Sequence, residues 1–186
     1  MDNLIFSKIG SDFDGTLVST YHLFLYYINN KLKTNYQPKD YDSYNFAEKL
    51  NGKDFEEEMI KIVTGTEEYL GKYKLYSGAK EFINSLKYPL TIITARKNGN
   101  PLLNCQGFLN SHFQGLRIIR ENHFDKKNIL KKLEIKVFFE DRKEIALDIA
   151  KQGITVFLKN QPYNQNVFHK NIIRFNSFNQ LKTFLE

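Results

Sequence analysis

The amino-acid sequence predicts an α/β fold: a mostly parallel sheet with helices on both faces and a small helical domain inserted after the first strand. Short apolar runs rich in β-branched residues alternate with helical patterns from residue 79 onward. Residues 18–74 carry helical patterns but no convincing strand. The chain has 186 residues, of which 41% are hydrophobic, enough for one proper core with an insertion. We therefore expect residues 1–17 and 75–186 to form an α/β core domain and residues 18–74 to form a helical cap.

An apolar run at residues 4–9 predicts the first strand, and it leads directly into two carboxylates. In an extended strand, residues i and i+2 point to the same side, so Asp12 and Asp14 face one point in space. Two adjacent carboxylates repel each other unless a cation lies between them or one is protonated. Gly15 permits a tight turn directly after them. The stretch Asp12-Phe13-Asp14-Gly15-Thr16 therefore predicts a cation site where the first strand ends.

Apolar residues spaced by three and four positions predict three helices within the insertion, at residues 21–32, 53–63 and 67–73. The polar, tyrosine-rich stretch 40–46 is expected to connect the first two. Another helix is expected at residues 79–86, directly after Ser77 and Gly78.

The rest of the chain alternates between strands and helices. Strands are expected at residues 89–94, 116–119, 137–139, 154–158 and 172–175. Helices are expected at residues 101–113, 126–133, 144–152 and 178–185, with Asp125 and Ser177 as N-caps of the second and the last. In such sheets, ligands bind beyond the carboxyl ends of the strands. Six chemically active side chains fall at predicted strand ends: Asp12, Asp14, Thr94, Arg96, Glu140 and Asp141.

Composition excludes several classes of protein. No apolar stretch approaches the roughly 20 residues that span a bilayer, and the N-terminus lacks a signal-peptide pattern. The single cysteine, Cys105, rules out an internal disulfide and is expected as a small core or helix residue. We therefore expect a soluble, cytoplasmic protein without a membrane partner. The net charge of +6 favours anionic partners, and the dispersed lysines favour a small phosphorylated substrate over nucleic acid.

Four short motifs at these strand ends resemble those of the haloacid-dehalogenase superfamily of phosphohydrolases. Asp12-Phe13-Asp14-Gly15-Thr16 resembles the first motif, and Thr94, after an apolar strand, resembles the second. Lys126 best matches the third, with Lys127 as a competing candidate, and the pair Glu140-Asp141 resembles the fourth. Glu140 stands where many relatives carry Asp. The resemblance covers the whole α/β domain and implies a Rossmann-like core with a helical cap.

Finer features resemble one branch of that superfamily, the 5′(3′)-deoxyribonucleotidases and their bacterial and phage relatives. These features are Ile93-Thr94-Ala95-Arg96, Glu140-Asp141-Arg142, the Pro162-Tyr163-Asn164 loop and Ile173-Arg174-Phe175-Asn176-Ser177. The resemblance implies a nucleotidase for a small phosphorylated metabolite such as a nucleoside or deoxynucleoside monophosphate.

The resemblance also implies how the site would work. It implies Mg²⁺-dependent hydrolysis of a phosphate monoester through an aspartyl phosphate, since a hard divalent cation holds anionic reactants together. Asp12 would be the nucleophile and Asp14 the general acid and base, while Thr94, the Ala95 N–H and Lys126 would hold the phosphoryl group. The expected metal ligands are Asp12, the carbonyl of Phe13, Asp14, Asp141 and, directly or through water, Glu140. The expected substrate-binding residues are Gly15, Thr16, Thr94, Ala95, Arg96, Lys126 and Arg142.

Some alternatives stay open at this point. The substrate is alternatively a sugar phosphate or the 3′ end of a polynucleotide, or the chain binds a phosphorylated ligand without catalysis. Arg96 and Arg142 either hold a phosphate or a base, or pair with a carboxylate. Four aromatic residues of the insertion either stack on a nucleobase or pack in the core: Phe24, Tyr27, Tyr44 and Phe46.

Overall fold

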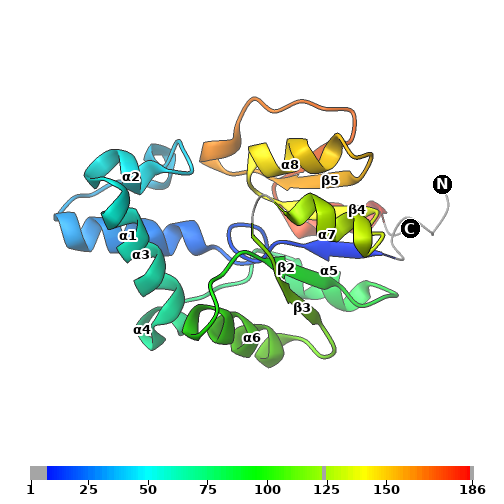
Figure 1. Cartoon of the computed structure of the whole chain (residues 1–186), viewed down its shortest axis with the longest axis horizontal. Coiled ribbons are helices and arrows are strands. Elements are labelled where there is room, and N and C mark those ends of the chain that lie inside the picture. The colour runs from blue at the N-terminus through cyan, green and yellow to red at the C-terminus, as the bar shows by residue number, and fades with distance from the viewer. Residues whose placement is uncertain (1–7, 123–124, 185–186) are drawn as a thin grey trace.

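The protein forms one six-stranded sheet with helices on both faces, as seen in a computed structural model that describes residues 8–122 and 125–184 (Figure 1). The strands are β1 (Ile9–Ser11), β2 (Thr91–Thr94), β3 (Arg117–Arg120), β4 (Val137–Glu140), β5 (Thr155–Lys159) and β6 (Ile172–Phe175). Their order is β3-β2-β1-β4-β5-β6, and every neighbouring pair is parallel. The predicted α/β fold is thereby confirmed. Residues 4–7 of the predicted first strand lie outside the described residues.

The central strands β1 and β4 are buried along their whole length, because helices cover both faces of the sheet. Helices α7 (Lys126–Lys132) and α8 (Lys143–Ala150) pack on one face, where Phe138 of β4 belongs to their apolar cluster. Helix α5 (Ala79–Ser85) and the 3₁₀ helix η4 (Phe178–Phe184) pack on the other, where Phe139 joins a second cluster. Adjacent residues of a strand point to opposite faces, so one short run supplies both cores.

The helices of residues 18–74, which we call the helical insertion, gather beyond the carboxyl ends of the strands, on the left in Figure 1. They are α1 (Thr20–Leu32), the 3₁₀ turn η2 (Pro38–Asp40), α2 (Phe46–Asn51), α3 (Lys53–Gly65) and α4 (Glu67–Leu70). Helix α3 packs on α6 (Asn100–His112), where the Asn104 side-chain amide donates to the carbonyl of Thr64 at 3.1 Å. Buried residues of α1 and α3 share the apolar cluster of α5 and the sheet, so the insertion is anchored on the core.

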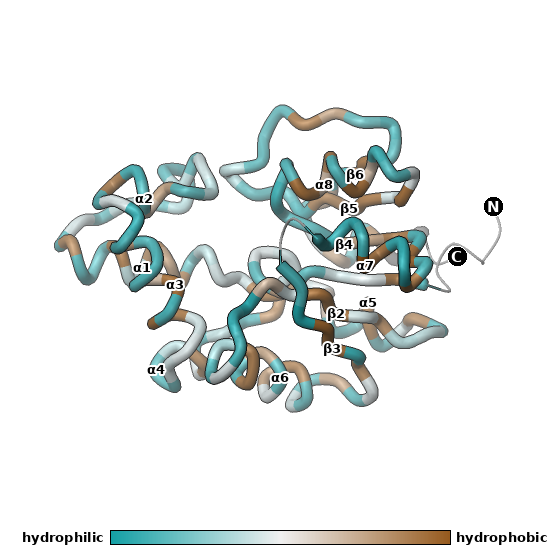
Figure 2. The backbone as a smooth tube through the Cα atoms, in the orientation of Figure 1, coloured by the Kyte–Doolittle hydropathy of each residue, from teal (hydrophilic) through white to brown (hydrophobic). Residues whose placement is uncertain are grey.

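Figure 2 shows strongly hydrophobic backbone in β2 and β5 and mixed colours along the insertion, as expected for half-buried amphipathic helices. Cys105 is buried in α6, as expected. No helix in the described ranges combines the length and the hydrophobicity needed to cross a membrane.

Three local predictions were wrong. Helix α2 begins at the end of the predicted connection and was not predicted, because its six residues between Asn45 and Gly52 span less than two helical turns and show no repeated apolar face. The C-terminal helix is a 3₁₀ helix, although Ser177 still accepts the N–H of Asn179 as an N-cap would. The side chain of Asp125 precedes α7 but does not cap it, since its carboxylate accepts from the amide of Asn122.

Candidate active site

The switch in strand order lies between β1 and β4, since the chain continues from β1 to β2 and β3 on one side and from β4 to β5 and β6 on the other. Pairing of Ser11 with Phe139 places the carboxyl ends of these two strands side by side. Just beyond them, carboxylate oxygens of Asp12, Glu140 and Asp141 lie within 4.8 Å of one another, and all three residues are buried. Two motifs 128 residues apart thus form one buried acidic cluster, defined here as Asp12, Glu140 and Asp141.

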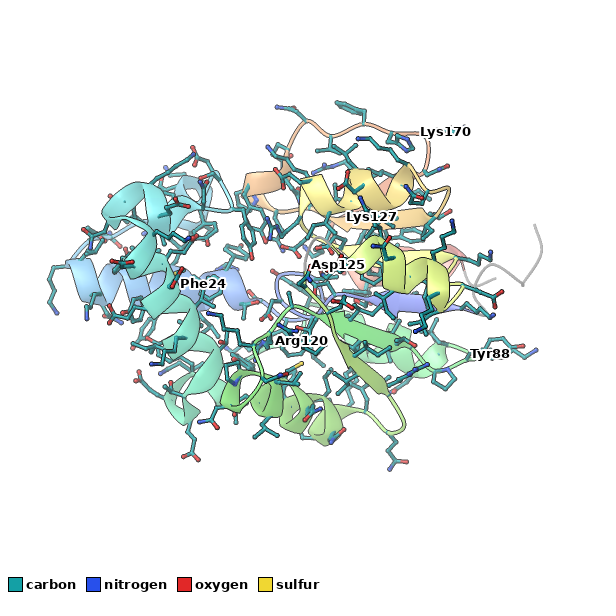
Figure 3. All side chains as sticks on the ribbon, viewed as in Figure 1. Phe24, Tyr88, Arg120, Asp125, Lys127 and Lys170 are labelled. Carbon is teal, nitrogen blue, oxygen red and sulfur yellow. The ribbon has the colours of Figure 1, made fainter. Side chains whose placement is uncertain are left out.

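Lys126, the first residue of α7, places its ammonium group against this acidic cluster. Its Nζ lies 3.0 Å from Asp12 Oδ1 and 3.0 Å from Glu140 Oε2, and the side chain is fully buried. Burial by itself would lower the pKa of Lys126, but the carboxylates of Asp12 and Glu140 outweigh it and raise that pKa above its usual value. Lys127 is partly exposed on α7 (Figure 3). Of the two candidate lysines, Lys126 is therefore the one that contacts the carboxylates.

The acidic cluster has more negative charge than one lysine offsets. Burial raises the pKa of Asp12 to about 7 despite the opposing effect of Lys126, and Glu140 and Asp14 add to the rise. Burial likewise raises the pKa of Asp141 well above its usual range, with further contributions from Glu140 and Asp12. Buried carboxylates in this number need protons or a further cation. Since oxygen atoms are the ligands that Mg²⁺ prefers, these residues fit a magnesium site.

Glu140 uses both of its carboxylate oxygens on neighbouring groups. Oε2 accepts from Lys126, and Oε1 accepts the backbone N–H groups of Asp141 and Arg142, each at 3.1 Å. Compared with an aspartate, Glu140 has one more methylene group, and this lets its carboxylate fold back over the turn that follows β4. Glu140 therefore fixes Lys126 and the backbone of Asp141, and this favours an indirect contribution to a metal site.

Asp141 is held by residues from three other parts of the chain. The Thr16 hydroxyl donates to its Oδ1 at 2.9 Å, and the Tyr163 hydroxyl donates to its Oδ2. The Asn164 side-chain amide donates to its backbone carbonyl, and Arg174 in turn donates to Asn164. We predicted no role for Tyr163, Asn164 or Arg174, although they lie in the two stretches that resemble the nucleotidase branch. The aromatic and amide residues after β5 were the signal that could have indicated this support.

Asp14 points away from the acidic cluster toward Arg96. The guanidinium donates from Nε to Oδ2 at 2.8 Å and from Nη2 to Oδ1 at 2.7 Å, while Nη1 donates to the carbonyl of Pro101. The Arg96 side chain is 3% exposed and that of Asp14 is 27% exposed. Of the two alternatives for Arg96, the structure has the carboxylate pair, so Arg96 is not free to bind a phosphate in this conformation.

Two further expected site residues, Phe13 and Thr16, have other partners than those implied, whereas Thr94 keeps the donor that its implied role needs. The Phe13 carbonyl accepts the N–H groups of Leu17 and Val18, so its lone pairs close a turn rather than face a metal. Thr16 is fully buried and contacts Asp141, which excludes direct contact with a substrate in the pocket. Thr94 is 1% exposed and its hydroxyl oxygen accepts the Arg96 N–H, which leaves the hydroxyl hydrogen available as a donor.

Gly15 lies directly under the Asp141 side chain. Its φ is +72°, and a Cβ placed there would lie 2.3 Å from Asp141 Oδ2 and 2.8 Å from the Tyr163 hydroxyl. Its N–H donates to Val18 and Thr20, and its carbonyl accepts from Gln161. Only glycine combines this backbone conformation with such a close approach. Gly15 also lines the pocket next to the cluster.

A pocket of about 810 Å³ opens between the helical insertion and the carboxyl ends of the strands. Asp12, Asp14 and Asp141 lie at its base, and Ala95, Arg96 and Arg142 line its sides. Two of the four expected aromatic residues, Phe24 and Tyr44, also line it, and Figure 3 labels Phe24 in the insertion. The other two, Tyr27 and Phe46, are buried in the apolar core. The volume lies within the range of small-molecule sites.

Arg142 is stacked on an aromatic ring in this pocket. Its guanidinium carbon lies 3.7 Å from the centroid of the Tyr44 ring, close enough for a cation–π interaction. Its Nε is buried and has no hydrogen-bond partner within residues 8–122 and 125–184. A donor of this kind at the wall of a pocket supports the alternative in which Arg142 binds a substrate.

Comparison with known proteins identifies relatives with nucleotidase names. The chain is 31% identical over 177 residues to a Bacillus subtilis protein named "Putative nucleotidase YqfW", covering 92% of this chain and 89% of that protein. It is 26% identical over 187 residues to the protein named "Nucleotidase CA_C3379" of Clostridium acetobutylicum, covering 91% and 88%. No protein-family profile matches the chain.

Solved structures share the fold. A haloacid-dehalogenase-superfamily hydrolase of Geobacter sulfurreducens superposes with a TM-score of 0.56 at 13% identity, covering 96% of this chain and 95% of that one. The superposition includes both the sheet and most of the insertion. The 31% identity over 92% of the chain shows that it belongs to the nucleotidase-like family that includes YqfW, and the solved structures show that its fold is that of haloacid-dehalogenase-superfamily hydrolases.

Proposed function

We propose that the protein is a Mg²⁺-dependent phosphomonoesterase that acts through an aspartyl phosphate on a small metabolite, such as a nucleoside or deoxynucleoside monophosphate. The observation that carries the proposal is the position of Asp12. Its carboxylate lies at the base of the pocket, 3.0 Å from the Lys126 ammonium and inside the buried acidic cluster. The nucleotidase names of the relatives support the class of substrate.

Asp12 and Asp141 would hold the cation, with Glu140 behind them, and Mg²⁺ would supply the positive charge that lets an anionic nucleophile approach a phosphate. An Asp12 oxygen bonds to phosphorus as the ester oxygen leaves. Lys126 offsets the negative charge on both Asp12 and the phosphoryl group, and the Thr94 hydroxyl and Ala95 N–H are the proposed donors to the phosphoryl oxygens.

Asp14 has the role of general acid and base in this proposal. It gives a proton to the leaving ester oxygen, then takes a proton from the water that attacks the aspartyl phosphate, and inorganic phosphate leaves with Asp12 restored.

The helical insertion has the role of a cap that selects the substrate. We propose residues 18–74 as this cap and residues 1–17 with 75–186 as the core domain. The pocket takes its lining from both, and Phe24 and Tyr44 offer aromatic surfaces to a nucleobase. A pocket lined by both the cap and the core favours a mononucleotide over the end of a polymer.

The test is a hydrolysis assay over nucleoside monophosphates, sugar phosphates and a 3′-phosphorylated oligonucleotide. We expect phosphate release from mononucleotides with Mg²⁺, loss of release with EDTA, and loss of release in Asp12→Asn. Asp125→Asn changes an exposed aspartate and is the matched control. Higher turnover of sugar phosphates or of the oligonucleotide would contradict the substrate class. Binding of beryllofluoride with Mg²⁺ but no hydrolysis of any ester would support a non-catalytic phospho-ligand protein instead.

A further inference from the structure

Tyr163 connects the helical insertion to the carboxylate of Asp141. It lies in the 3₁₀ turn η3 (Pro162–Asn164), which follows β5, and it is buried. Its hydroxyl donates to Asp141 Oδ2, while the Thr16 hydroxyl donates to Oδ1. Both oxygens of Asp141 are therefore oriented by a hydroxyl group. The space for the Tyr163 hydroxyl exists because Gly15 has no side chain, since a Cβ there would come within 2.8 Å of it.

The ring of Tyr163 is packed by three tyrosines of the insertion. Its centroid lies 5.7 Å from that of Tyr41, 6.1 Å from that of Tyr44 and 6.3 Å from that of Tyr21, and all three pairs are edge-to-face. Such contacts add to the stability gained from burial and also define the plane of the ring. The position of the Tyr163 hydroxyl thus depends on side chains that the insertion supplies.

The backbone on both sides of Tyr163 is also fixed. Before it, the Gln161 side-chain amide donates to the carbonyl of Gly15 and to the hydroxyl of Tyr76. After it, the Asn164 side chain donates to the carbonyls of Asp141 and Lys159. With the turn and the ring both held, the hydroxyl has little freedom to leave the carboxylate.

We propose that Tyr163 is a positioning residue that orients Asp141 for Mg²⁺ binding and makes the metal affinity depend on how the helical insertion packs against the core. The proposal rests on the magnesium site of the proposed function. A carboxylate turns about its own bond unless hydrogen bonds hold it, and groups that orient a metal ligand typically contribute a factor of about 10 to 100 in metal affinity. In this proposal Tyr163 acts through Asp141, whose Oδ2 accepts from its hydroxyl.

The test measures Mg²⁺ binding by isothermal titration calorimetry in the absence of substrate. For Tyr163→Phe, which removes the hydroxyl and keeps the ring, we expect the Mg²⁺ dissociation constant to rise about 10- to 100-fold. At saturating Mg²⁺ we expect kcat to stay close to that of the unsubstituted enzyme, because Asp12, Asp14 and Lys126 are unchanged.

Tyr73→Phe is the matched control. Tyr73 is a buried residue near the end of the insertion, and its hydroxyl donates to the carbonyl of Val63 at 3.0 Å rather than to a carboxylate. Its loss removes one buried hydrogen bond and should lower the melting temperature without changing the Mg²⁺ dissociation constant. Tyr41→Leu removes a ring that packs on Tyr163, and we expect it to weaken Mg²⁺ binding by a smaller factor than Tyr163→Phe does.

The outcomes separate this proposal from the magnesium site on which it rests. If the unsubstituted protein binds no Mg²⁺, both are wrong. If it binds Mg²⁺ and Tyr163→Phe binds it equally well or more tightly, only the role of Tyr163 is wrong. Equal weakening by Tyr73→Phe and Tyr163→Phe would also overturn it, because a general loosening of the fold would then explain the effect.

Discussion

The guanidinium of Arg96 donates two hydrogen bonds to the carboxylate of Asp14, at 2.8 and 2.7 Å. This pair gives the two aspartates of one strand end different surroundings. Asp12 is buried beside Lys126, whereas Asp14 is partly exposed beside an arginine. Two carboxylates with different environments can take different roles, one as nucleophile and the other in proton transfer.

The Arg96–Asp14 pair predicts the behaviour of Arg96→Lys. Lysine keeps the charge but loses the planar fork, so Asp14 is held less precisely. We expect kcat to fall by about 10-fold or more, since the contribution of a general acid is about 10²–10⁴-fold. The Mg²⁺ dissociation constant should stay unchanged, because Asp14 is not part of the acidic cluster. Steady-state kinetics at saturating Mg²⁺ measures this, with the exposed Arg117→Lys as the control.

Lys126 and Lys127 predict stability effects of very different size from the same substitution. Lys126→Met leaves Asp12 and Glu140 buried without their ammonium partner, and breaking a buried ion pair costs about 3–5 kcal/mol. Lys127→Met changes a partly exposed side chain and should shift stability by no more than about 0.5 kcal/mol. Urea unfolding of the metal-free proteins measures both. Similar losses in the two variants would show that the Lys126 contacts contribute little.

The raised pKa of Asp12 predicts that stabilisation by Mg²⁺ grows with pH. Between the ordinary pKa of 3.8 and about 7, folded Asp12 still holds a proton that the unfolded chain has lost. The folded state therefore binds more protons there, and the metal-free protein loses stability as pH rises through this window. Burial raises the pKa of Asp141 as well, which acts in the same direction.

A cation competes with those protons, so its apparent affinity increases as they leave. We expect the rise in melting temperature on adding Mg²⁺ to be small near pH 5 and larger near pH 8. Differential scanning fluorimetry with and without Mg²⁺ across this range tests it. An effect of Mg²⁺ that is equal at all pH values, or larger at low pH, would contradict a site built from protonated buried carboxylates.

Gly15→Ala should disrupt the site through both strain and steric overlap. Its φ of +72° is unfavourable for alanine, and the Cβ would overlap Asp141 and Tyr163. Gly153→Ala has a similar φ of +82° with nothing within 4 Å of the new Cβ, so it isolates the cost of backbone conformation. We expect roughly 1 kcal/mol lost for Gly153→Ala and a larger loss, with weakened Mg²⁺ binding, for Gly15→Ala. Equal changes in melting temperature and in Mg²⁺ affinity for the two variants would show that Asp141 moves to make room for the new methyl group.

Much of the fold is readable from the sequence because the signals are local. Alternation of β-branched runs and helical periods indicated every strand of the sheet within a few residues, and the paired carboxylates with Gly15 and Thr16 indicated the site. Where local signals are short, prediction was less successful, as for α2, whose six residues span less than two helical turns.

What the sequence by itself determined is the set of chemical groups at the carboxyl ends of β1, β2 and β4, because strand ends and motif spacing are properties of neighbouring residues. What only the tertiary structure decided is the choice of partners. In the folded protein Lys126 rather than Lys127 contacts the carboxylates, and Arg96 pairs with Asp14. The Phe13 carbonyl closes a turn, and Tyr163 and Asn164 donate hydrogen bonds to Asp141. The contacts of Lys126 with Asp12 and of Arg96 with Asp14 join residues 114 and 82 positions apart. Burial determines their energy, so they follow from the packed sheet and insertion rather than from a local pattern.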